Sequence, residues 1–331
     1  MLGVGAGRRA VAPIVLTLVV LLPAAASGAS GITATSDEHH LPVGGAPVSQ
    51  PTAGRVDSCE TTFGSGGGAQ SSSSDPWFNG DGTFDVAKKP VVQGSVSWPQ
   101  ATMTVTVRGS TRVVTSNDLP TDATTGVFPI SSSDPASQYD RNPNSIRAQQ
   151  ISLSLPANPK VASKPTCTSL GPVGIMLNGV LLFNALDAEG RDALAYEIQD
   201  SCRGHPMMAG EYHYHALSPC LAARLDAGTG HSQLLGYAMD GFGIYGPRGD
   251  HGQDLTDADL DACHGRTDTI VWNGRKVKMY HYVMTAEYPY SIGCFRGTPV
   301  SSGRSGGGGG SPGGGGPGGP GGGPPGPPPG G

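Results

Sequence analysis

The chain has 331 residues, 14% of them charged, and a formal net charge of −5. A slightly acidic chain with a pI near 6.0 lacks the basic footprint that nucleic acids require, so we exclude them as partners. Beyond the N-terminal leader, no segment is long and apolar enough to cross a membrane.

The first residues resemble a secretory leader. Arg8 and Arg9 precede an apolar stretch over residues 11–22, which is shorter than a membrane span, and small residues follow it. This pattern predicts a signal peptide over residues 1–29, with a retained anchor helix as the alternative. We therefore expect a secreted, periplasmic or cell-surface protein.

Two further segments have a composition that opposes folding. Residues 30–75 are of low complexity and linker-like, and residues 301–331 are almost entirely Gly, Pro and Ser. Such a tail cannot bury enough apolar surface to offset its ordering entropy, and it lacks the strict period of collagen. We expect a disordered tail and a single folded domain over residues 76–300.

That domain is expected to be mainly β (a β-rich α+β fold) built of hairpins with short helices on loops. Asn178-Gly179 and Asn273-Gly274 favour tight hairpin turns. Helical spacing covers residues 192–199, and Thr256 is placed to cap a short helix. The strands predicted from alternation are, in chain order, 102–107, 112–114, 150–155, 174–177, 180–183, 269–272 and 276–282.

Six cysteines in an exported chain predict disulfides rather than zinc thiolates, since no Cys-x-x-Cys pair occurs. Proximity along the chain favours Cys202–Cys220 and Cys263–Cys294. This leaves Cys59–Cys167 as the third bridge.

The most informative stretch is Glu211-Tyr-His-Tyr-His215. Successive side chains of a strand point to opposite faces, so Tyr212 and Tyr214 would share one face and His213 and His215 the other. A shorter copy, Tyr280-His281-Tyr282, follows. Each copy is preceded by a cysteine and by a glycine with a basic neighbour, and each is followed by a second cysteine. This shared order suggests a remote duplication.

The chain resembles the YHYH-domain family, which is named for the motif at residues 212–215. The resemblance runs from about residue 123 to residue 298 and implies an exported single domain whose biochemical role is not established. Val283 departs from the pattern, because it stands where the second motif would have its last histidine. The blocks that carry the resemblance are TGVFP (125–129), DRNPN (140–144), GIMLNGV (174–180), CRGHP (202–206), YHYH (212–215) with Cys220, His231-Ser232, GYAMDGFGIYG (236–246) and residues 280–294.

We expect the histidines to form a metal site. His213 and His215 would supply two imidazoles and His281 a third, for a divalent transition metal such as Zn, Cu or Fe. His205, His231 and Asp240 are candidates for additional ligands or for orienting the first three. An open fourth position would permit metal-assisted hydrolysis or redox chemistry, and the sequence does not decide whether the protein is an enzyme.

The alternative is recognition without metal, because each histidine can also serve as an ordinary hydrogen-bonding residue. A tyrosine-lined cleft would then bind a small molecule, a carbohydrate polymer or a protein at the cell surface. The expected cleft-lining residues are Tyr212, Tyr214, Tyr237, Tyr245, Tyr280 and Tyr282.

Overall fold

The computed structural model describes residues 37–64 and 69–301, so the predicted signal peptide and almost all of the predicted tail lie outside the described residues. Strands make up 30% of the structure and helices 7%, which confirms the β-rich prediction. Within the described ranges, no helix has the length and apolar character that a membrane span requires.

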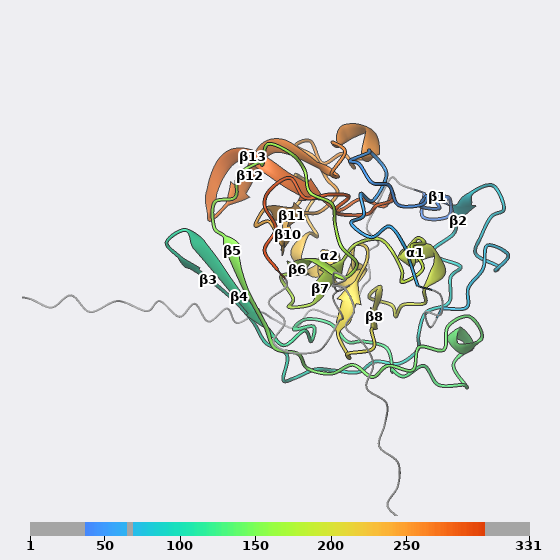
Figure 1. Cartoon of the computed structure of the whole chain (residues 1–331). Helices are drawn as coiled ribbons and strands as arrows, with labels where there is room; N and C mark the ends of the chain where they lie inside the picture. The colour runs from blue at the N-terminus through green and yellow to red at the C-terminus, as the bar shows by residue number, and fades with distance from the viewer. Residues whose placement is uncertain (1–36, 65–68, 302–331) are drawn as a thin grey trace, which may run out of the picture. The chain divides into compact units, whose positions relative to one another are not determined.

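An eight-stranded sheet forms the larger part of the fold (Figure 1). Its strands lie in the order β12-β13-β11-β10-β6-β7-β9-β8. Their bounds are β6 Pro172–Met176, β7 Leu181–Phe183, β8 Gly204–Pro206, β9 Tyr212–Tyr214, β10 Leu234–Ala238, β11 Gly243–Tyr245, β12 Gly265–Trp272 and β13 Arg275–Val283.

This sheet consists of two halves with the same topology, β6–β9 and β10–β13. In each half the first two strands are antiparallel, and the fourth strand is parallel to the second. The third strand then pairs antiparallel with the fourth at the edge of the sheet. The first strands, β6 and β10, pair with each other at the centre. The sequence echo is therefore a structural repeat.

A buried carboxylate anchors the motif of the first half. Asp200 accepts hydrogen bonds from the backbone N–H groups of Cys202 and Gly204 at 2.9 and 3.2 Å, and from the hydroxyl of Tyr212 at 2.8 Å. Arg203 has a positive φ of 62°. A methyl group at Gly204 would overlap the Tyr212 ring, so the close approach requires glycine.

The second half repeats this arrangement. Asp261 accepts from the N–H groups of Cys263 and Gly265 at 2.9 and 3.2 Å, and from the Tyr280 hydroxyl at 3.0 Å. His264 takes the positive φ, 68°, and a methyl group at Gly265 would overlap the Tyr280 ring. The same contacts at equivalent positions show that the repeat extends to individual side chains.

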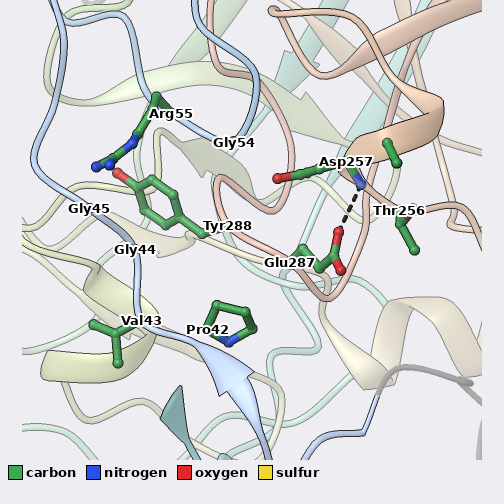
Figure 2. A pocket seen from close by; sticks show the side chains of 11 residues that line it. Pro42, Val43, Gly44, Gly45, Gly54, Arg55, Thr256, Asp257, Glu287 and Tyr288 are labelled. Carbon is green, nitrogen blue, oxygen red and sulfur yellow. Dashed lines mark hydrogen bonds between the residues drawn. The ribbon is translucent and has the colours of Figure 1, made fainter. Parts of the chain in front are cut away.

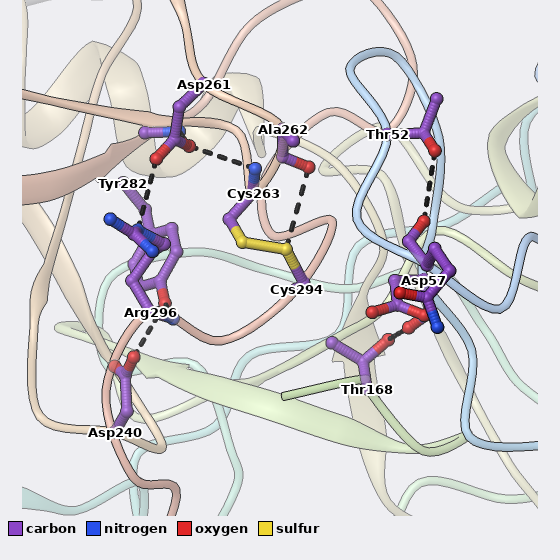
Figure 3. The surroundings of a disulfide bond; sticks show 12 residues. Thr52, Asp57, Thr168, Asp240, Asp261, Ala262, Cys263, Tyr282, Cys294 and Arg296 are labelled. Carbon is purple, nitrogen blue, oxygen red and sulfur yellow. Dashed lines mark hydrogen bonds and ion pairs between the residues drawn. A yellow bond between two sulfur atoms is a disulfide. The ribbon is translucent and has the colours of Figure 1, made fainter. Parts of the chain in front are cut away.

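The second tyrosine of each motif is held by the tight turn that follows the first strand of its half. Tyr214 Oη accepts a hydrogen bond from Asn178 Nδ2 at 3.1 Å. Tyr282 donates to Asp240 Oδ2 at 2.6 Å (Figure 3). Asp240 also accepts from the N–H of Gly297. Asp240, which the sequence predicts as an additional metal ligand or as a residue that orients one, accepts a hydrogen bond from a tyrosine in the structure.

A second sheet consists of β3 (Met103–Arg108), β4 (Thr111–Ser116) and β5 (Ile151–Pro156), as the alternation predicts. Leu153 and Leu155 of β5 are buried in the same core as the large sheet. The Arg112 guanidinium lies 4.3 Å from the ring centres of both Tyr237 and Trp272, which ties β4 to β10 and β12.

The N-terminal part of the described chain contributes to a second core. Leu41 in β1 (Leu41–Pro42) and Val56 are buried together with Phe84 of β2 (Thr83–Phe84). Leu41 and Val56 therefore reach a core, although the composition of this part of the chain predicts a loose linker. Composition reports the average polarity of a segment and misses single apolar residues that reach a core.

Helices are short. The spacing that predicts two turns over residues 192–199 gives one turn, α1 (Ala193–Tyr196), and Thr256 begins η2 (Asp257–Asp259) with a capping box. Helix α2 (Pro219–Leu225) was not predicted, although Ser218 caps it and Pro219 stands in its first turn. A further short helix is η1 (Pro135–Gln138).

Three disulfides join Cys59 to Cys167, Cys202 to Cys220 and Cys263 to Cys294. These are the pairings that the sequence favours. The last two occupy equivalent places in the two halves, and Figure 3 shows the second beside Asp261. Each bridge therefore joins the turn before its strand pair, β8–β9 or β12–β13, to the segment that follows that pair.

The two anchoring carboxylates provide a matched test of the fold. Asp200 is 1% exposed, whereas the Asp261 side chain is 38% exposed. We expect Asp200→Asn to lower the free energy of unfolding by about 2–3 kcal/mol, because a buried amide N–H₂ would face N–H donors. Asp261→Asn should cost less, because water can replace the lost acceptor. Urea denaturation of the oxidised proteins measures both, and equal losses would contradict this explanation.

Candidate metal centre

The structure separates the three histidines that we expected to share one ion. His213 lies on β9 and His281 on β13, and four strands of the same sheet lie between them. At about 4.8 Å per strand, the two positions are roughly 24 Å apart across the sheet. The expectation of a shared centre was therefore wrong, because the repeated strands lie far apart in one sheet and do not face each other.

His213 and His215 instead meet His205 from the neighbouring strand. His205 is directly opposite His213 in the β8–β9 ladder, and the three side chains offer ligand atoms within 4.8 Å of one another. All three residues are buried, with exposed fractions of 3–4%. The predicted alternation holds as well, since the rings of Tyr212 and Tyr214 contact each other on the opposite face.

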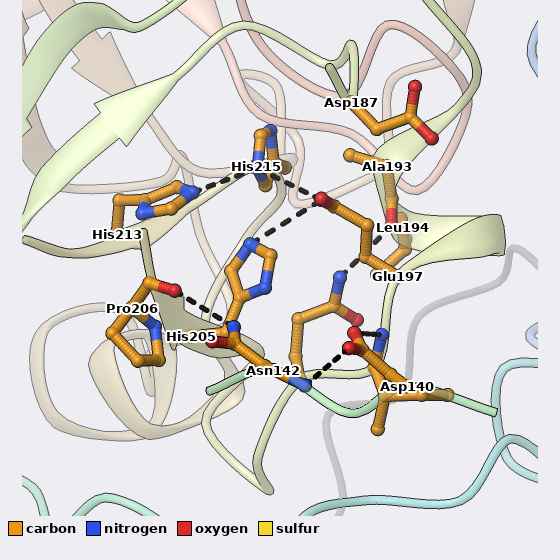
Figure 4. Close-up of polar contacts among 12 residues, drawn as sticks. Asp140, Asn142, Asp187, Ala193, Leu194, Glu197, His205, Pro206, His213 and His215 are labelled. Atoms are coloured by element: carbon orange, nitrogen blue, oxygen red, sulfur yellow. Dashed lines mark hydrogen bonds and ion pairs between the residues drawn. The ribbon is translucent and has the colours of Figure 1, made fainter. Parts of the chain in front are cut away.

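A carboxylate borders this cluster. Glu197, the residue that ends α1, places Oε2 3.4 Å from Nε2 of His205 and 3.4 Å from Nε2 of His215 (Figure 4). The Nε2 atoms of His213 and His215 are 3.1 Å apart. Ligand atoms about 2.0–2.1 Å from a tetrahedral zinc ion are about 3.4 Å from one another. The three measured separations are close to that value.

The ring protons of His213 and His215 can be placed from their hydrogen bonds. Nδ1 of His213 contacts the carbonyl oxygen of Glu211 at 3.2 Å, and Nδ1 of His215 contacts that of Asn184 at 2.5 Å. A carbonyl oxygen only accepts, so each Nδ1 carries the proton and each Nε2 of a neutral ring is a lone pair. The two lone pairs point at each other across 3.1 Å, an arrangement that a shared cation stabilises.

Burial makes it unfavourable for a proton to serve as the cation that the two Nε2 atoms share. It lowers the pKa of His215 to about 4, an effect that the hydrogen bond from Nδ1 to the Asn184 carbonyl only partly opposes. Burial likewise holds the pKa of His205 well below its usual value, and raises the pKa of Glu197 well above its own. The cluster thus opposes an isolated charge on any of these three groups, and a divalent ion would balance the carboxylate.

Nε2 of His205 and Oε2 of Glu197 have no hydrogen-bond partner among the described residues, although both are buried. A buried polar atom without a partner costs about 1–3 kcal/mol, so such atoms need an explanation. Metal coordination supplies one, because it uses the lone pairs that hydrogen bonding leaves unused.

Residues 152–256 match the family model described as YHYH protein. The resemblance to the YHYH family is confirmed. The match is shorter than the stretch over which we saw the resemblance, and it contains Glu197, His205, His213, His215 and His231 but ends before His281. No curated protein and no solved structure matches the chain.

The tyrosines of the YHYH motif and its repeat belong to the core. Tyr212, Tyr214, Tyr245, Tyr280 and Tyr282 are at most 6% exposed, and Tyr237 is 7% exposed. Their partners are internal, such as the Val271 carbonyl that accepts the hydroxyl of Tyr245. The expectation that these six rings line a cleft is therefore wrong, because all six rings are buried in the structure.

His281 has its own neighbours at the far end of the sheet. His231, Asp268 and His281 form a second group whose ligand atoms lie within 4.8 Å of one another. Burial lowers the pKa of His281 to about 4. His231, predicted as an additional ligand, thus accompanies His281 rather than the YHYH histidines.

Sequence reasoning missed Glu197 and Asp268. Glu197 lies within the segment 192–199 that has helical spacing, and nothing in the local sequence ties it to the histidines. Asp268 could have been found from the predicted Asn273-Gly274 hairpin, whose register places Asp268 opposite Met279 and hence diagonal to His281 on the same face.

A cavity of about 540 Å³ lies away from both histidine groups. Arg55, Asp257, Glu287 and Tyr288 are among the residues that line it, and Glu287 accepts the N–H of Asp257 there (Figure 2). It contains none of the site residues predicted from the sequence.

The hydrogen bonds predict the tautomers of the metal-free protein. We expect His213 and His215 to carry their proton on Nδ1 at neutral pH, whereas the exposed ring of His251 should average over both forms. Long-range ¹⁵N–¹H correlation spectra of the imidazoles distinguish these states. A stable Nε2–H signal from His213 or His215 would contradict the assignment.

Proposed function

We propose that this protein is an exported YHYH protein that holds one transition-metal ion in the cluster of His205, His213, His215 and Glu197. Three imidazoles and one carboxylate are a donor set suited to Zn²⁺, with copper and iron as competitors. The observation that carries the proposal is the 3.1 Å approach of two Nε2 atoms whose Nδ1 atoms both face carbonyl oxygens.

The donor count favours a resident ion over a catalytic one. Structural zinc sites are closed by four protein ligands, while catalytic sites keep one position for water or substrate. Here Glu197 Oε2 lies 3.4 Å from two of the three imidazoles, and the histidines are almost entirely buried. We therefore propose that the ion fastens β8 and β9 to the end of α1, and that hydrolysis or redox chemistry is not its role.

The three disulfides and the predicted leader support an exported location. The alternative function, recognition through a tyrosine-lined cleft, loses its support because the tyrosine rings lie in the core.

Glu197→Gln tests the site. The substitution keeps the size of the side chain but removes the charge that would neutralise the ion, so we expect zinc affinity to fall at least about tenfold. Metal analysis of untagged protein and competition with a chromophoric chelator measure this. The matched control is Glu189→Gln, which changes a partly exposed carboxylate paired with Arg191. Equal affinities of the Glu197 and Glu189 variants for zinc would refute the assignment.

Removal of the ion should destabilise the fold. Because a ligand that binds only the native state stabilises it, protein saturated at about 100 times Kd should gain about 3 kcal/mol over the stripped form. Thermal unfolding with and without a strong chelator measures the shift. His215→Ala should remove most of the difference, and an unchanged midpoint in the wild-type protein would speak against a resident ion.

A further inference from the structure

We propose a second metal site, more open than the first, formed by His231, Asp268 and His281 at the other end of the sheet. It is independent of the proposed function, because it shares no residue with the YHYH cluster. Its ligand class is a divalent first-row transition metal held by two imidazoles and one carboxylate, with remaining positions for solvent.

The sheet register brings two of the three groups together. In the β12–β13 ladder, Arg266 is directly opposite His281 and Asp268 is opposite Met279. Residues two apart share a face, so Asp268 lies diagonal to His281 on its side of the sheet. His231 arrives from the loop before β10, and its ring centre is 5.9 Å from that of His281.

The donor atom of His231 is available for coordination. Nδ1 of His231 contacts the carbonyl oxygen of Ser232 at 2.8 Å, so the proton of the neutral ring is on Nδ1 and Nε2 is a lone pair. This Nε2 is buried without a hydrogen-bond partner, and Oδ1 of Asp250 lies 4.0 Å from it. One ligand atom each from His231, Asp268 and His281 lies within 4.8 Å of the others.

Comparison of the two halves explains why this site is incomplete. His281 corresponds to His213, but Arg266 stands opposite His281 where His205 stands opposite His213. Val283 stands where the first half has His215. The second half therefore offers fewer ligands, and its side chains are less enclosed, with His231 19% and Asp268 14% exposed. Three protein ligands with open positions are typical of exchangeable or catalytic ions.

Arg266 competes with the ion for Asp268. Its Nε lies 2.6 Å from Asp268 Oδ2, and the arginine side chain is 28% exposed. Ion pairs near the surface contribute little net free energy, so a divalent ion can displace the guanidinium toward solvent. The positive charge then remains close to the ion and weakens its binding. We infer a lower affinity here than in the closed cluster.

Zinc titration of the full-length, disulfide-intact protein, with a chromophoric chelator as competitor, tests the proposal. The wild-type protein should bind two equivalents, one tight and one weak. Asp268→Asn and His231→Gln, both at partly exposed positions, should each remove the weak equivalent and leave the tight one. Arg266→Gln should tighten the weak site by at least about tenfold, because it removes the competing charge.

Glu197→Gln is the matched control, since it should weaken the tight equivalent and leave the weak one unchanged. The proposal is overturned if the wild-type protein binds no weak equivalent, or if that equivalent survives in both Asp268→Asn and His231→Gln. An unchanged weak affinity in Arg266→Gln would also contradict it, because the contact with Asp268 would then not compete with the metal.

Discussion

In each half of the sheet, one carboxylate determines which way the Tyr-His-Tyr strand faces. Asp200 and Asp261 each bind two backbone N–H groups of a tight turn and the hydroxyl of the first tyrosine. With that tyrosine held in the core, the two-residue period of a strand places the following histidine on the opposite face. The positions of His213 and His281 follow from this constraint.

The two halves share a scaffold but differ in chemistry. The first half gathers two more imidazoles around its strand histidine and adds a carboxylate that lies 3.4 Å from those two imidazoles. The second half replaces one imidazole by Arg266 and another by Val283, and keeps a carboxylate that the arginine already neutralises. Few substitutions on a common framework thus separate a closed four-ligand cluster from an open three-ligand one.

Much of the fold could be predicted from local pattern. Alternation located the hairpin of β3 and β4, and Asn273-Gly274 located the turn between β12 and β13, because both signals act between neighbours in sequence. Strand order is a different matter. Nothing in the two Tyr-His-Tyr segments tells whether they face each other or lie at opposite ends of one sheet, so the expected union of His213 with His281 was wrong.

The site could be predicted only in part, because some of its contacts follow from local sequence and others depend on the tertiary fold. The pairing of His213 with His215 follows from strand period alone. The addition of Glu197 depends on where α1 ends relative to β8, a tertiary relation with no local signal. Burial of the tyrosines was also missed, since an aromatic ring with a hydroxyl suits a cleft and a core equally well until its partner, here Asp200 or Asp240, is known.

The central claim is that the converging lone pairs of the YHYH histidines share a metal ion. Anomalous diffraction from crystals of untagged protein, with data on both sides of the zinc absorption edge, tests it most directly. The account predicts one strong peak about 2.0–2.1 Å from Nε2 of His205, His213 and His215 and from a Glu197 oxygen. Zinc-saturated crystals with no anomalous peak among these four side chains, or with a peak bound elsewhere only, would contradict it.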